Sequence, residues 1–292
     1  MNKNNNKSLL GYYILTQKEV MKIYILKIRL RYFSDIPHMI TAWSGSFSLK
    51  IVYDYYQRIG IDFEKKARKP FIVEPLIHNE KYILTGIYIK NGKGEFEKIS
   101  NPFVMKNQDI FQLKITFTDY DAAQKFMEAF LKESSLKEPA GIFIPDSISI
   151  EEKELPIIEF TDSNKWSEFK FRIRFLTPTN FIFHGHEIPF PSPFRLLYNI
   201  SKDYYEFTKK NYKEKIEKLM LNGLEIEDST IKKVFVDIGE GRKVPCFIGS
   251  ANYIACTKEG YLKAFITLFE WAEFLGVGKS KSLGFGRIKL EF

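Results

Sequence analysis

The first run of alternating apolar and polar residues predicts a β-strand over residues 21–32. From Leu26 onward every second side chain is apolar, which places four of them on one face: Leu26, Ile28, Leu30 and Tyr32. The opposite face then carries three cations: Lys27, Arg29 and Arg31. This pattern is typical of a half-buried strand with one face open to solvent.

Later periodicities predict a βαββαβ order for the first half of the chain. Residues 46–59 have helical spacing and end at Gly60, a typical C-cap. A second helix is expected to start at about Asp119, a good N-cap. Strand-like runs complete the set, at 71–77, 81–89, 109–119 and a strand pair within 141–152, with a hairpin-like turn at 90–95. This order is that of a ferredoxin-like unit.

The same order recurs in the second half. Strands are expected at 168–183, 231–239, 243–255 and 285–292, and helices at 191–211 and 260–276. The last helix has an apolar stripe, expected to be buried, of Leu262, Phe265, Ile266, Phe269 and Ala272. The fold class is therefore predicted as α+β, with two tandem ferredoxin-like (RRM-like) domains. The expected division is a flexible extension at 1–20, domains at 21–153 and 167–292, and a linker at 154–166.

Composition agrees with two domains and adds a charge argument. The chain has 292 residues, 45% of them apolar, and a formal net charge of +8. All of that excess lies in residues 1–69, while the rest of the chain balances. A basic N-terminal third suggests a polyanionic partner, and a Lys-rich surface that serves solubility is the alternative.

Cysteine usage and hydropathy narrow the compartment. Cys246 and Cys256 fit neither a zinc spacing nor a Cys-x-x-Cys redox motif, so we expect two buried thiols in a reducing cytoplasm. No apolar run reaches the length of roughly 18 residues that a membrane span requires, so no membrane partner is expected. The polar N-terminus has no apolar core of a signal peptide.

The stretch 276–290, GVGKSKSLGFGRIKL, contains a Gly-Lys-Ser sequence like the end of a nucleotide-binding P-loop. The first glycine of that motif is missing, since Glu273 stands in its place. The context is also reversed, because a helix ends at about Leu275 and a strand starts at about Phe285. A P-loop instead leaves a strand and enters a helix, whose N-terminus binds the phosphate. We therefore interpret residues 276–286 as a glycine-bracketed loop that binds a different polyanion.

This ending resembles the C-terminal signature of the CRISPR-associated RAMP proteins, and in particular their repeat-cleaving endoribonuclease, Cas protein six. The signature is Gly-hydrophobic-Gly, five residues with a cation, then Gly-hydrophobic-Gly, with Val277 and Phe285 in the hydrophobic places. Weaker similarities lie at residues 68–77, 171–200 and 244–255. The resemblance implies an enzyme that cuts precursor CRISPR RNA within each repeat without a metal. The 2′-hydroxyl of the RNA attacks the adjacent phosphorus, which leaves a cyclic phosphate and a free 5′-hydroxyl.

Many members of that family use a histidine near the start of the first helix, and this chain has none there. A helical wheel instead places four polar residues on one face of the helix: Ser46, Lys50, Tyr53 and Gln57. The catalytic candidates are therefore Lys50, Tyr53, Ser46 and, in the loop before the helix, His38. The alternative for Lys50 is an i,i+4 ion pair with Asp54 on a solvated helix face. His184 and His186 have a spacing that metals can use, but no third ligand is evident, so no metal and no cofactor are expected.

The resemblance also points to RNA-binding residues. They are Lys279, Ser280, Lys281 and Arg287 of the glycine-rich stretch, Arg242 and Lys243 of a hairpin turn, and Lys27, Arg29 and Arg31 of the first strand. For the last three, the alternative is that they face water or pair with acids. The implied partner is CRISPR repeat RNA, precursor and mature. Other CRISPR effector subunits and a second copy of the chain, forming a homodimer, are further candidates. A non-catalytic RNA-binding subunit of a CRISPR effector is the alternative function.

Overall fold

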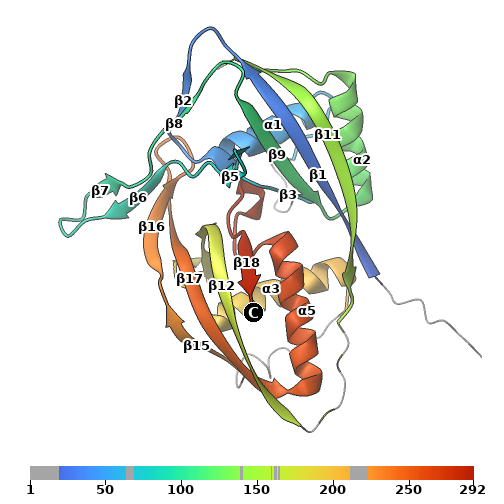
Figure 1. Ribbon diagram of the computed structural model, residues 1–292, viewed down its shortest axis with the longest axis vertical. Coiled ribbons are helices and arrows are strands. Elements are labelled where there is room, and N and C mark those ends of the chain that lie inside the picture. Colours follow the sequence, from blue (N-terminus) through green and yellow to red (C-terminus); the bar gives the residue numbers. More distant parts are fainter. Residues whose placement is uncertain are drawn as a thin grey trace, which may run out of the picture.

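The computed structural model describes residues 20–63, 69–138, 141–158, 160, 163, 165–210 and 223–292. Figure 1 shows two sheets placed end to end, the first carrying helices α1 and α2 and the second carrying α3 and α5. All pairings between the strands of the two large sheets are antiparallel. The expected α+β class with two tandem ferredoxin-like units is confirmed. The expected extension at 1–20 lies almost entirely outside the described residues, and the domain boundaries stay a prediction.

The first sheet has the strand order of a ferredoxin-like unit, with β11, β1, β9 and β3 side by side. Its strands are β1 (Val20–Phe33), β3 (Phe71–Val73), β4 (Ile77–His78), β5 (Lys81–Tyr82), β9 (Ile110–Phe117), β10 (Leu136–Glu138) and β11 (Gly141–Pro156). Helices α1 (Ser44–Gln57) and α2 (Tyr120–Lys132) cover one face. The N-cap of α2 is Asp119, as expected, because its side chain accepts a hydrogen bond from the backbone N–H of Asp121 at 3.1 Å.

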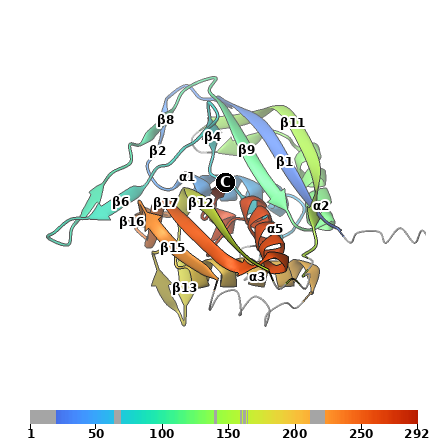
Figure 2. The ribbon, with the colours of Figure 1, turned by 60° about the horizontal axis from the view of Figure 1, so that its bottom comes forward.

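The second sheet repeats this order with β18, β12, β17 and, beside β17, both β15 and β16. Its own strands are β12 (Trp166–Thr179), β15 (Leu224–Ser229), β16 (Lys232–Asp237), β17 (Lys243–Lys258) and β18 (Ile288–Glu291). Helices α3 (Pro193–Thr208) and α5 (Glu259–Leu275) cover its inner face, as Figure 2 shows. Two small ribbons stand apart from both sheets: β2 (His38–Ile40) with β8 (Phe103–Met105), and β13 (Phe181–Phe183) with β14 (His186–Ile188).

The two halves of the chain are joined by more contacts than a simple tandem of domains would have. The expected hairpin is present as β6 (Ile87–Lys90) and β7 (Phe96–Lys98), but β6 pairs with β16 and so extends the second sheet. The lower ends of β1 and β11 also reach the second core, where Ile23 and Leu155 are buried beside α5 residues. The halves are therefore joined by a strand pairing and by a common apolar layer.

A buried ion pair also joins the halves. Arg287, just before β18, lies 2.8 Å from the Glu74 carboxylate that follows β3, and both side chains are almost fully buried. The same carboxylate contacts Lys114 at 2.9 Å and accepts a hydrogen bond from the Tyr82 hydroxyl at 2.6 Å. Burial alone would raise the pKa of Glu74. The charges of Arg287 and Lys114 and the Tyr82 hydrogen bond outweigh burial and hold the pKa below its ordinary value.

Three expectations need correction, and one element was not expected. The segment 141–152 is not a strand pair, because β11 runs unbroken with a single register shift against β1 between Arg29 and Leu30. The buried stripe of α5 is rotated, because Ala264, Leu268 and Trp271 are buried while Leu262 and Ile266 are only half-buried. The short ribbon of β2 and β8 was not expected. Only Cys246 is a buried thiol, since Cys256 is exposed.

The Glu74–Arg287 pair yields a stability prediction. We expect Arg287→Met to lower the free energy of unfolding at neutral pH by about 3–5 kcal/mol, because it leaves a buried carboxylate with one cation fewer. The folded pKa of Glu74 is depressed, so its contribution is present above the unfolded pKa and is lost as pH falls through the folded pKa. The difference in free energy of unfolding between variant and wild type should therefore decrease as the pH is lowered. Denaturant titration at several pH values measures it.

The matched control is Arg174→Met, which removes an exposed arginine whose pair with Glu291 spans 3.2 Å. Its effect should stay below about 1 kcal/mol at every pH. If the difference in free energy of unfolding between Arg287→Met and wild type does not change with pH, titration of the Glu74 carboxylate does not account for the destabilisation.

Candidate functional site

The glycine-rich stretch forms a loop whose two ends are bonded together. Helix α5 ends at Leu275 with Gly276 as its C-cap, as expected, and the regular strand starts at Ile288, later than expected. At the neck, the backbone N–H of Val277 donates to Gly286 O at 2.8 Å, and the tip forms a short 3-10 turn, η1 (Lys281–Leu283). All four glycines of the motif have positive φ, from 69° to 80°, a region that residues with a Cβ rarely adopt.

The protein's own backbone explains why glycines are required here. A Cβ at Gly286 would lie 1.8 Å from Val277 O, and a Cβ at Gly278 would lie 2.2 Å from Asn180 O. A Cβ at Gly284 would lie 2.6 Å from the Pro75 ring. The hydrophobic members of the motif, Val277 and Phe285, are completely buried. The glycines thus allow the loop to pack tightly against its neighbours.

Trp43 connects this loop to the start of α1. Its indole Nε1 donates a hydrogen bond to Leu283 O at 2.6 Å, and its ring packs edge-on against Phe285 at 5.4 Å between centroids. Its backbone N–H donates to Asp237 O at 2.8 Å, at the end of β16 where the turn to β17 begins. Trp43 is 1% exposed and was not singled out in the sequence. Its position just before the first helix was the available signal, because a large apolar residue there can fix the direction in which the chain enters a helix.

The glycine-rich loop and the β16–β17 turn therefore meet at the N-terminus of α1. Ser46 donates its hydroxyl to Ile238 O at 3.0 Å, which fixes the β16–β17 turn beside the helix. Arg242 in that turn is exposed, and Lys243 lies with its Nζ 5.0 Å above the rings of both Tyr88 and Phe96. The first turn of α1 contains no acid, so the positive end of its dipole is not neutralised by its own residues. The dipole therefore favours an anion near this end of α1, while Ser44 and Gly45 themselves are buried and Leu283 O lies beside Gly45.

The predicted residues of the loop have different surroundings. Lys279 is exposed, and no carboxylate of the described chain lies within ion-pair distance of it. Lys281 instead pairs with Asp203 of α3 at 2.5 Å, and Ser280 and Ser282 are half-buried. Arg287 is 4% exposed, and its guanidinium donates to the carbonyls of Glu273 and Phe274 besides contacting Glu74. Arg287 is thus engaged within the protein, and its expected contact to RNA stays a prediction.

Lys50 lies one turn further along α1, in a cluster of three charges. Its Nζ contacts Asp54 at 3.0 Å and Glu138 of β10 at 2.5 Å. The ion pair with Asp54 is the alternative that the sequence left open. Burial opposes the Lys50 charge, but the hydrogen bonds to Glu138 and Asp54 outweigh it and raise the pKa of Lys50. Burial raises the pKa of Glu138 as well, against the opposing effect of Lys50. Lys50 can thus act as a cation or an acid, and it is unsuited to act as a base.

Neither Tyr53 nor His38 contacts Lys50 in the interactions described for them. Tyr53 is half-buried and packs edge-on against Phe71 at 6.4 Å between ring centroids. His38 pairs with Met105 in the ribbon of β2 and β8. His184 and Gly185 both have positive φ and form the turn between β13 and β14, so His184 stands in a turn and not on a strand face. Within the described ranges no group of three potential ligands could hold a metal ion.

The basic face of β1 is formed as predicted, but its cations are paired. Leu26, Ile28, Leu30 and Tyr32 are completely buried, and the alternate residues are not. Lys27 lies 3.4 Å from Glu151, and Arg29 and Arg31 lie 4.0 and 2.9 Å from Asp146. Pairing with acids is again the alternative that the sequence left open.

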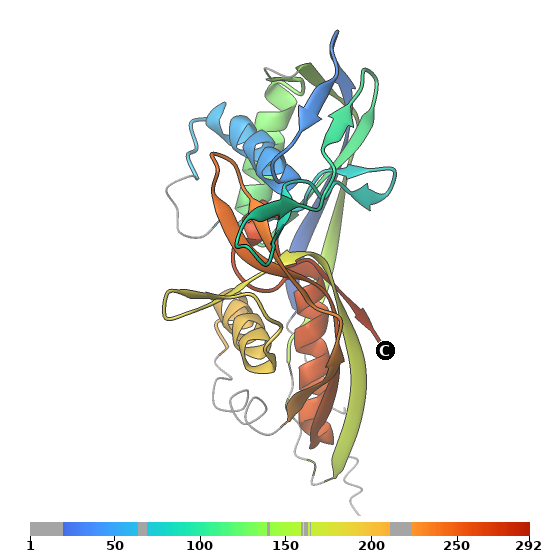
Figure 3. The same cartoon turned by 90° about the vertical axis from the view of Figure 1, so that its left-hand side faces the viewer.

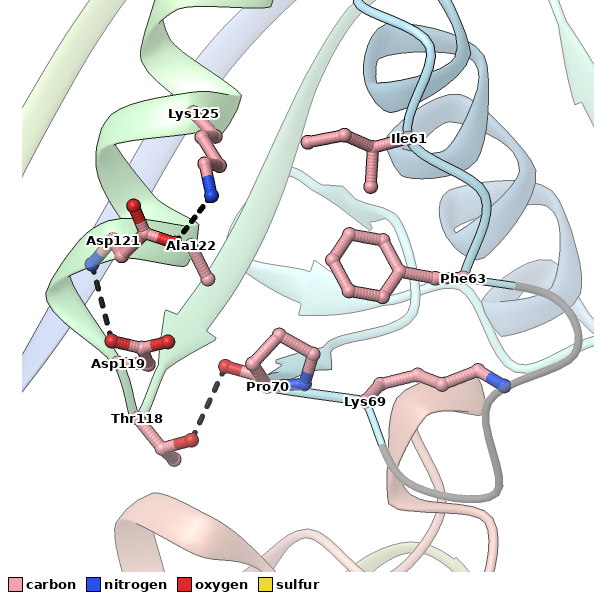
Figure 4. Close-up of a pocket in the computed structure, with 9 residues that line it drawn as sticks. All are labelled: Ile61, Phe63, Lys69, Pro70, Thr118, Asp119, Asp121, Ala122 and Lys125. Carbon is pink, nitrogen blue, oxygen red and sulfur yellow. Dashed lines mark hydrogen bonds and ion pairs between the residues drawn. The ribbon is translucent and has the colours of Figure 1, made fainter.

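A pocket of about 470 Å³ lies away from this site, between the segment after α1 and the N-terminus of α2 (Figure 4). Its polar groups are engaged with one another: Lys125 with Asp121 at 2.6 Å, and the Thr118 hydroxyl with Pro70 O at 3.2 Å. None of the predicted site residues lines it. No described helix has the length and apolar character needed to span a membrane.

Comparisons with known proteins agree with this arrangement. The sequence model of the CRISPR-associated endoribonuclease Cas6 matches residues 173–288, which include the glycine-rich loop. A search of curated protein sequences finds no match. Many solved structures share the fold. A Cas6 product complex from Thermus thermophilus has a TM-score of 0.62 at 16% identity, over 92% of this chain and all of that one.

Two further structures are similar over nearly their whole length. A complex of a second Cas6 with a substrate mimic has a TM-score of 0.55 at 13% identity, over 92% of this chain and 99% of that one. A Cas6-related protein from Pyrococcus furiosus has a TM-score of 0.54 at 15% identity, over 94% and 99%. The resemblance to the CRISPR-associated RAMP endoribonucleases and their tandem ferredoxin-like fold is confirmed.

The contact between α1 and the loop yields a second prediction. A Cβ at Gly45 would lie 2.0 Å from Leu283 O and 2.3 Å from Trp43 Nε1. Gly→Ala in a helix ordinarily stabilises by about 0.5–1 kcal/mol, but here we expect Gly45→Ala to destabilise the protein by about 1–3 kcal/mol. Hydrogen exchange of a peptide covering 279–286 should accelerate, because the Trp43–Leu283 bond is displaced. Gly92→Ala, with open space around its Cβ, is the control. Equal stability and exchange in both variants would contradict the coupling.

Proposed function

We propose that this protein is an endoribonuclease that binds precursor CRISPR RNA and cuts it within its repeats, giving mature guide RNA. The observation that carries the proposal is the junction at Trp43, which brings the glycine-rich loop, the β16–β17 turn and the N-terminus of α1 together. Lys279 and Arg242 are exposed cations on two of these three segments. A phosphodiester at this junction would meet both cations and the positive end of α1.

Two kinds of likeness support the proposal. The Cas6 family model covers residues 173–288, and therefore the whole of the loop. Solved structures with the same fold include a Cas6 bound to product and a Cas6 bound to a substrate mimic. Because those proteins of the same fold bind a product and a substrate mimic, RNA is the first partner to test for this chain.

The reaction we propose balances within the RNA itself. The 2′-oxygen of one nucleotide bonds to the adjacent phosphorus while the bond from that phosphorus to the 5′-oxygen breaks. The 2′-hydroxyl loses its proton and the departing 5′-oxygen gains one, which gives a 2′,3′-cyclic phosphate and a 5′-hydroxyl. The nucleophile is supplied by the substrate, so no metal is needed to activate a water molecule. The protein has to position the groups, move these protons and stabilise the charge on the phosphorane.

Lys50 is assigned the role of cation and acid. Its pKa lies above the ordinary value, so at neutral pH it carries the proton that a departing 5′-oxygen needs. Ser46 and Tyr53 are assigned to orient the RNA, since each has a hydroxyl on α1, and His38 is the candidate for accepting the 2′-hydroxyl proton. To reach the phosphate, Lys50 must exchange at least one carboxylate contact for a contact to RNA.

The alternative function, a non-catalytic RNA-binding subunit, is supported by the same cluster of Lys50, Asp54 and Glu138. Two carboxylates already contact Lys50, and α1 has no histidine. A RAMP-fold subunit that holds guide RNA without cutting it would keep the loop and its cations and would need no free acid. Other effector subunits or a second copy of the chain would then be partners of the RNA-bound form.

Cleavage of repeat RNA in the presence of EDTA separates the two readings. We expect single-turnover cleavage at one position, and a loss of about 10²-fold or more in rate for Lys50→Ala, in the range of a lost proton donor. Lys125→Ala is the matched control, because Lys125 also forms an i,i+4 ion pair on an exposed helix face, with Asp121. Tight binding of repeat RNA with no product after long incubation would leave only the non-catalytic subunit.

The loop assignment is tested by salt dependence. Lys279→Ala should weaken binding of repeat RNA and reduce the slope of log affinity against log salt by about one, the effect of one lost phosphate contact. Lys289→Ala is the control, since Lys289 is exposed on β18 outside the loop. An unchanged slope in Lys279→Ala would remove the loop from the RNA interface.

A further inference from the structure

A row of partly exposed aromatic side chains lies on the second half, where the β13–β14 ribbon meets α3. Phe183 of the ribbon is 41% exposed, and Phe194 and Tyr198 of α3 are 39% and 43% exposed. Figure 3 shows the ribbon projecting beside α3, below the turn between β16 and β17. We call Phe183, Phe194, Arg195 and Tyr198 the aromatic platform. Large apolar side chains gathered on a surface mark an interaction site more often than single exposed ones do.

Arg195 holds this row together. Its guanidinium carbon lies 3.4 Å from the centroid of the Phe183 ring and 4.9 Å from that of Phe194. The residue is only 8% exposed, yet no carboxylate of the described chain lies within ion-pair distance of it. A cation held against aromatic faces without a neutralising acid is suited to bind an anion or to stack on a planar group.

Helical spacing sets the second part of the row. Phe194 and Tyr198 are four residues apart on α3, so their side chains lie on one face of the helix. Their rings are nearly parallel, with an angle of 13° between planes and 6.4 Å between centroids. The sequence from Phe181 to Lys202 contains a single acid, Glu187.

The platform adjoins the glycine-rich loop. Asn180, immediately before β13, accepts the backbone hydrogen bond of Lys279 at 3.0 Å. On the other side, Lys281 pairs with Asp203 of α3, five residues beyond Tyr198. Asp203 lies about 140° around α3 from Tyr198, on the other flank of the helix. The link from the loop to the aromatic row is therefore Asn180, which leads directly into β13.

We propose that the aromatic platform binds unpaired nucleotides of the RNA that lie next to the segment held by the glycine-rich loop. Bases stack on Phe194 and Tyr198, and Arg195 contacts a phosphate or a base plane. Phe183, whose ring already contacts Arg195 and His184, holds the arginine in place. The occupant is single-stranded RNA, because exposed parallel rings with an unneutralised arginine match the alternation of bases and phosphates. A paired helix hides its base faces and cannot stack in this way. The proposal rests on the proposed function and specifies which part of the RNA this surface reads.

The test uses the full-length protein and two fluorescein-labelled RNAs. One is a single-stranded oligouridylate of about 12 nucleotides, within the range that such surfaces cover, and the other is a blunt hairpin with no single-stranded flank. Fluorescence anisotropy should show that the double variant Phe194→Ala, Tyr198→Ala weakens binding of the oligouridylate about tenfold or more and leaves the hairpin nearly unchanged. Arg195→Lys keeps the positive charge but removes the planar guanidinium group. It should therefore weaken binding of the oligouridylate by a smaller factor than the double variant does.

Tyr120→Ala is the matched control, because Tyr120 is also a partly exposed tyrosine on a helix and lies on the first half of the chain. Ultraviolet cross-linking of the oligouridylate, read by mass spectrometry, should place cross-links on peptides covering 181–200. Circular dichroism and thermal unfolding check that each variant is folded. Unchanged affinity of a folded double variant, equal losses for both RNAs, or absence of oligouridylate binding to the wild type would each overturn the proposal.

Cleavage is measured separately, so that the two proposals fail independently. A wild type that does not cut repeat RNA, combined with a double variant that loses the oligouridylate, would support the platform and contradict the endoribonuclease. A wild type that cuts repeat RNA, combined with a double variant that binds the oligouridylate normally, would overturn the platform alone.

Discussion

The position of the candidate site depends on the buried contact between Glu74 and Arg287. Glu74 follows the short strand β3 of the first half, and Arg287 precedes the last strand of the second. Glu74 has a second cation, Lys114, in its own half, whereas the carboxylate that pairs with the buried Arg287 comes from the other half. A buried arginine without that carboxylate would cost several kcal/mol, so the second half depends on the first at this point. The neighbours of these two residues are then brought together as well. Pro75 is placed against Gly284, and the glycine-rich loop is placed against the start of α1, where Trp43 binds Leu283.

This constraint changes how the glycine motif is understood. Three of its glycines approach the protein's own backbone or a proline ring to distances that no Cβ could occupy. The motif therefore gives the loop a fixed shape, and the proposed RNA contact depends on the side chains that the loop exposes. Lys279 is displayed, Lys281 is committed to Asp203, and Arg287 is committed to Glu74. Binding to a loop fixed in this way costs less conformational entropy than binding to a mobile one.

The local elements could be read from the sequence because period and capping are local properties. The strand β1 and its two faces, the N-cap at Asp119 and the end of α5 at Leu275 all follow from residues close in the chain. The contacts between distant segments could not be read in this way. Nothing near Arg287 indicates that its partner is Glu74, and nothing near Ile87 indicates that β6 joins the second sheet. For the same reason, Arg287 was expected at the RNA, and Trp43 and Arg195 were overlooked.

The chemistry of α1 is limited by charge balance. When Lys50, Asp54 and Glu138 are all ionised, the cluster carries one net negative charge and repels a phosphodiester. Burial already raises the pKa of Glu138, and an approaching phosphate would raise it further because two negative charges disfavour each other. Proton uptake by Glu138 would then remove one negative charge and leave Lys50 bound only to Asp54. If the protein binds RNA here as proposed, the availability of the Lys50 charge would be linked to that binding through a carboxylate on β10, outside α1.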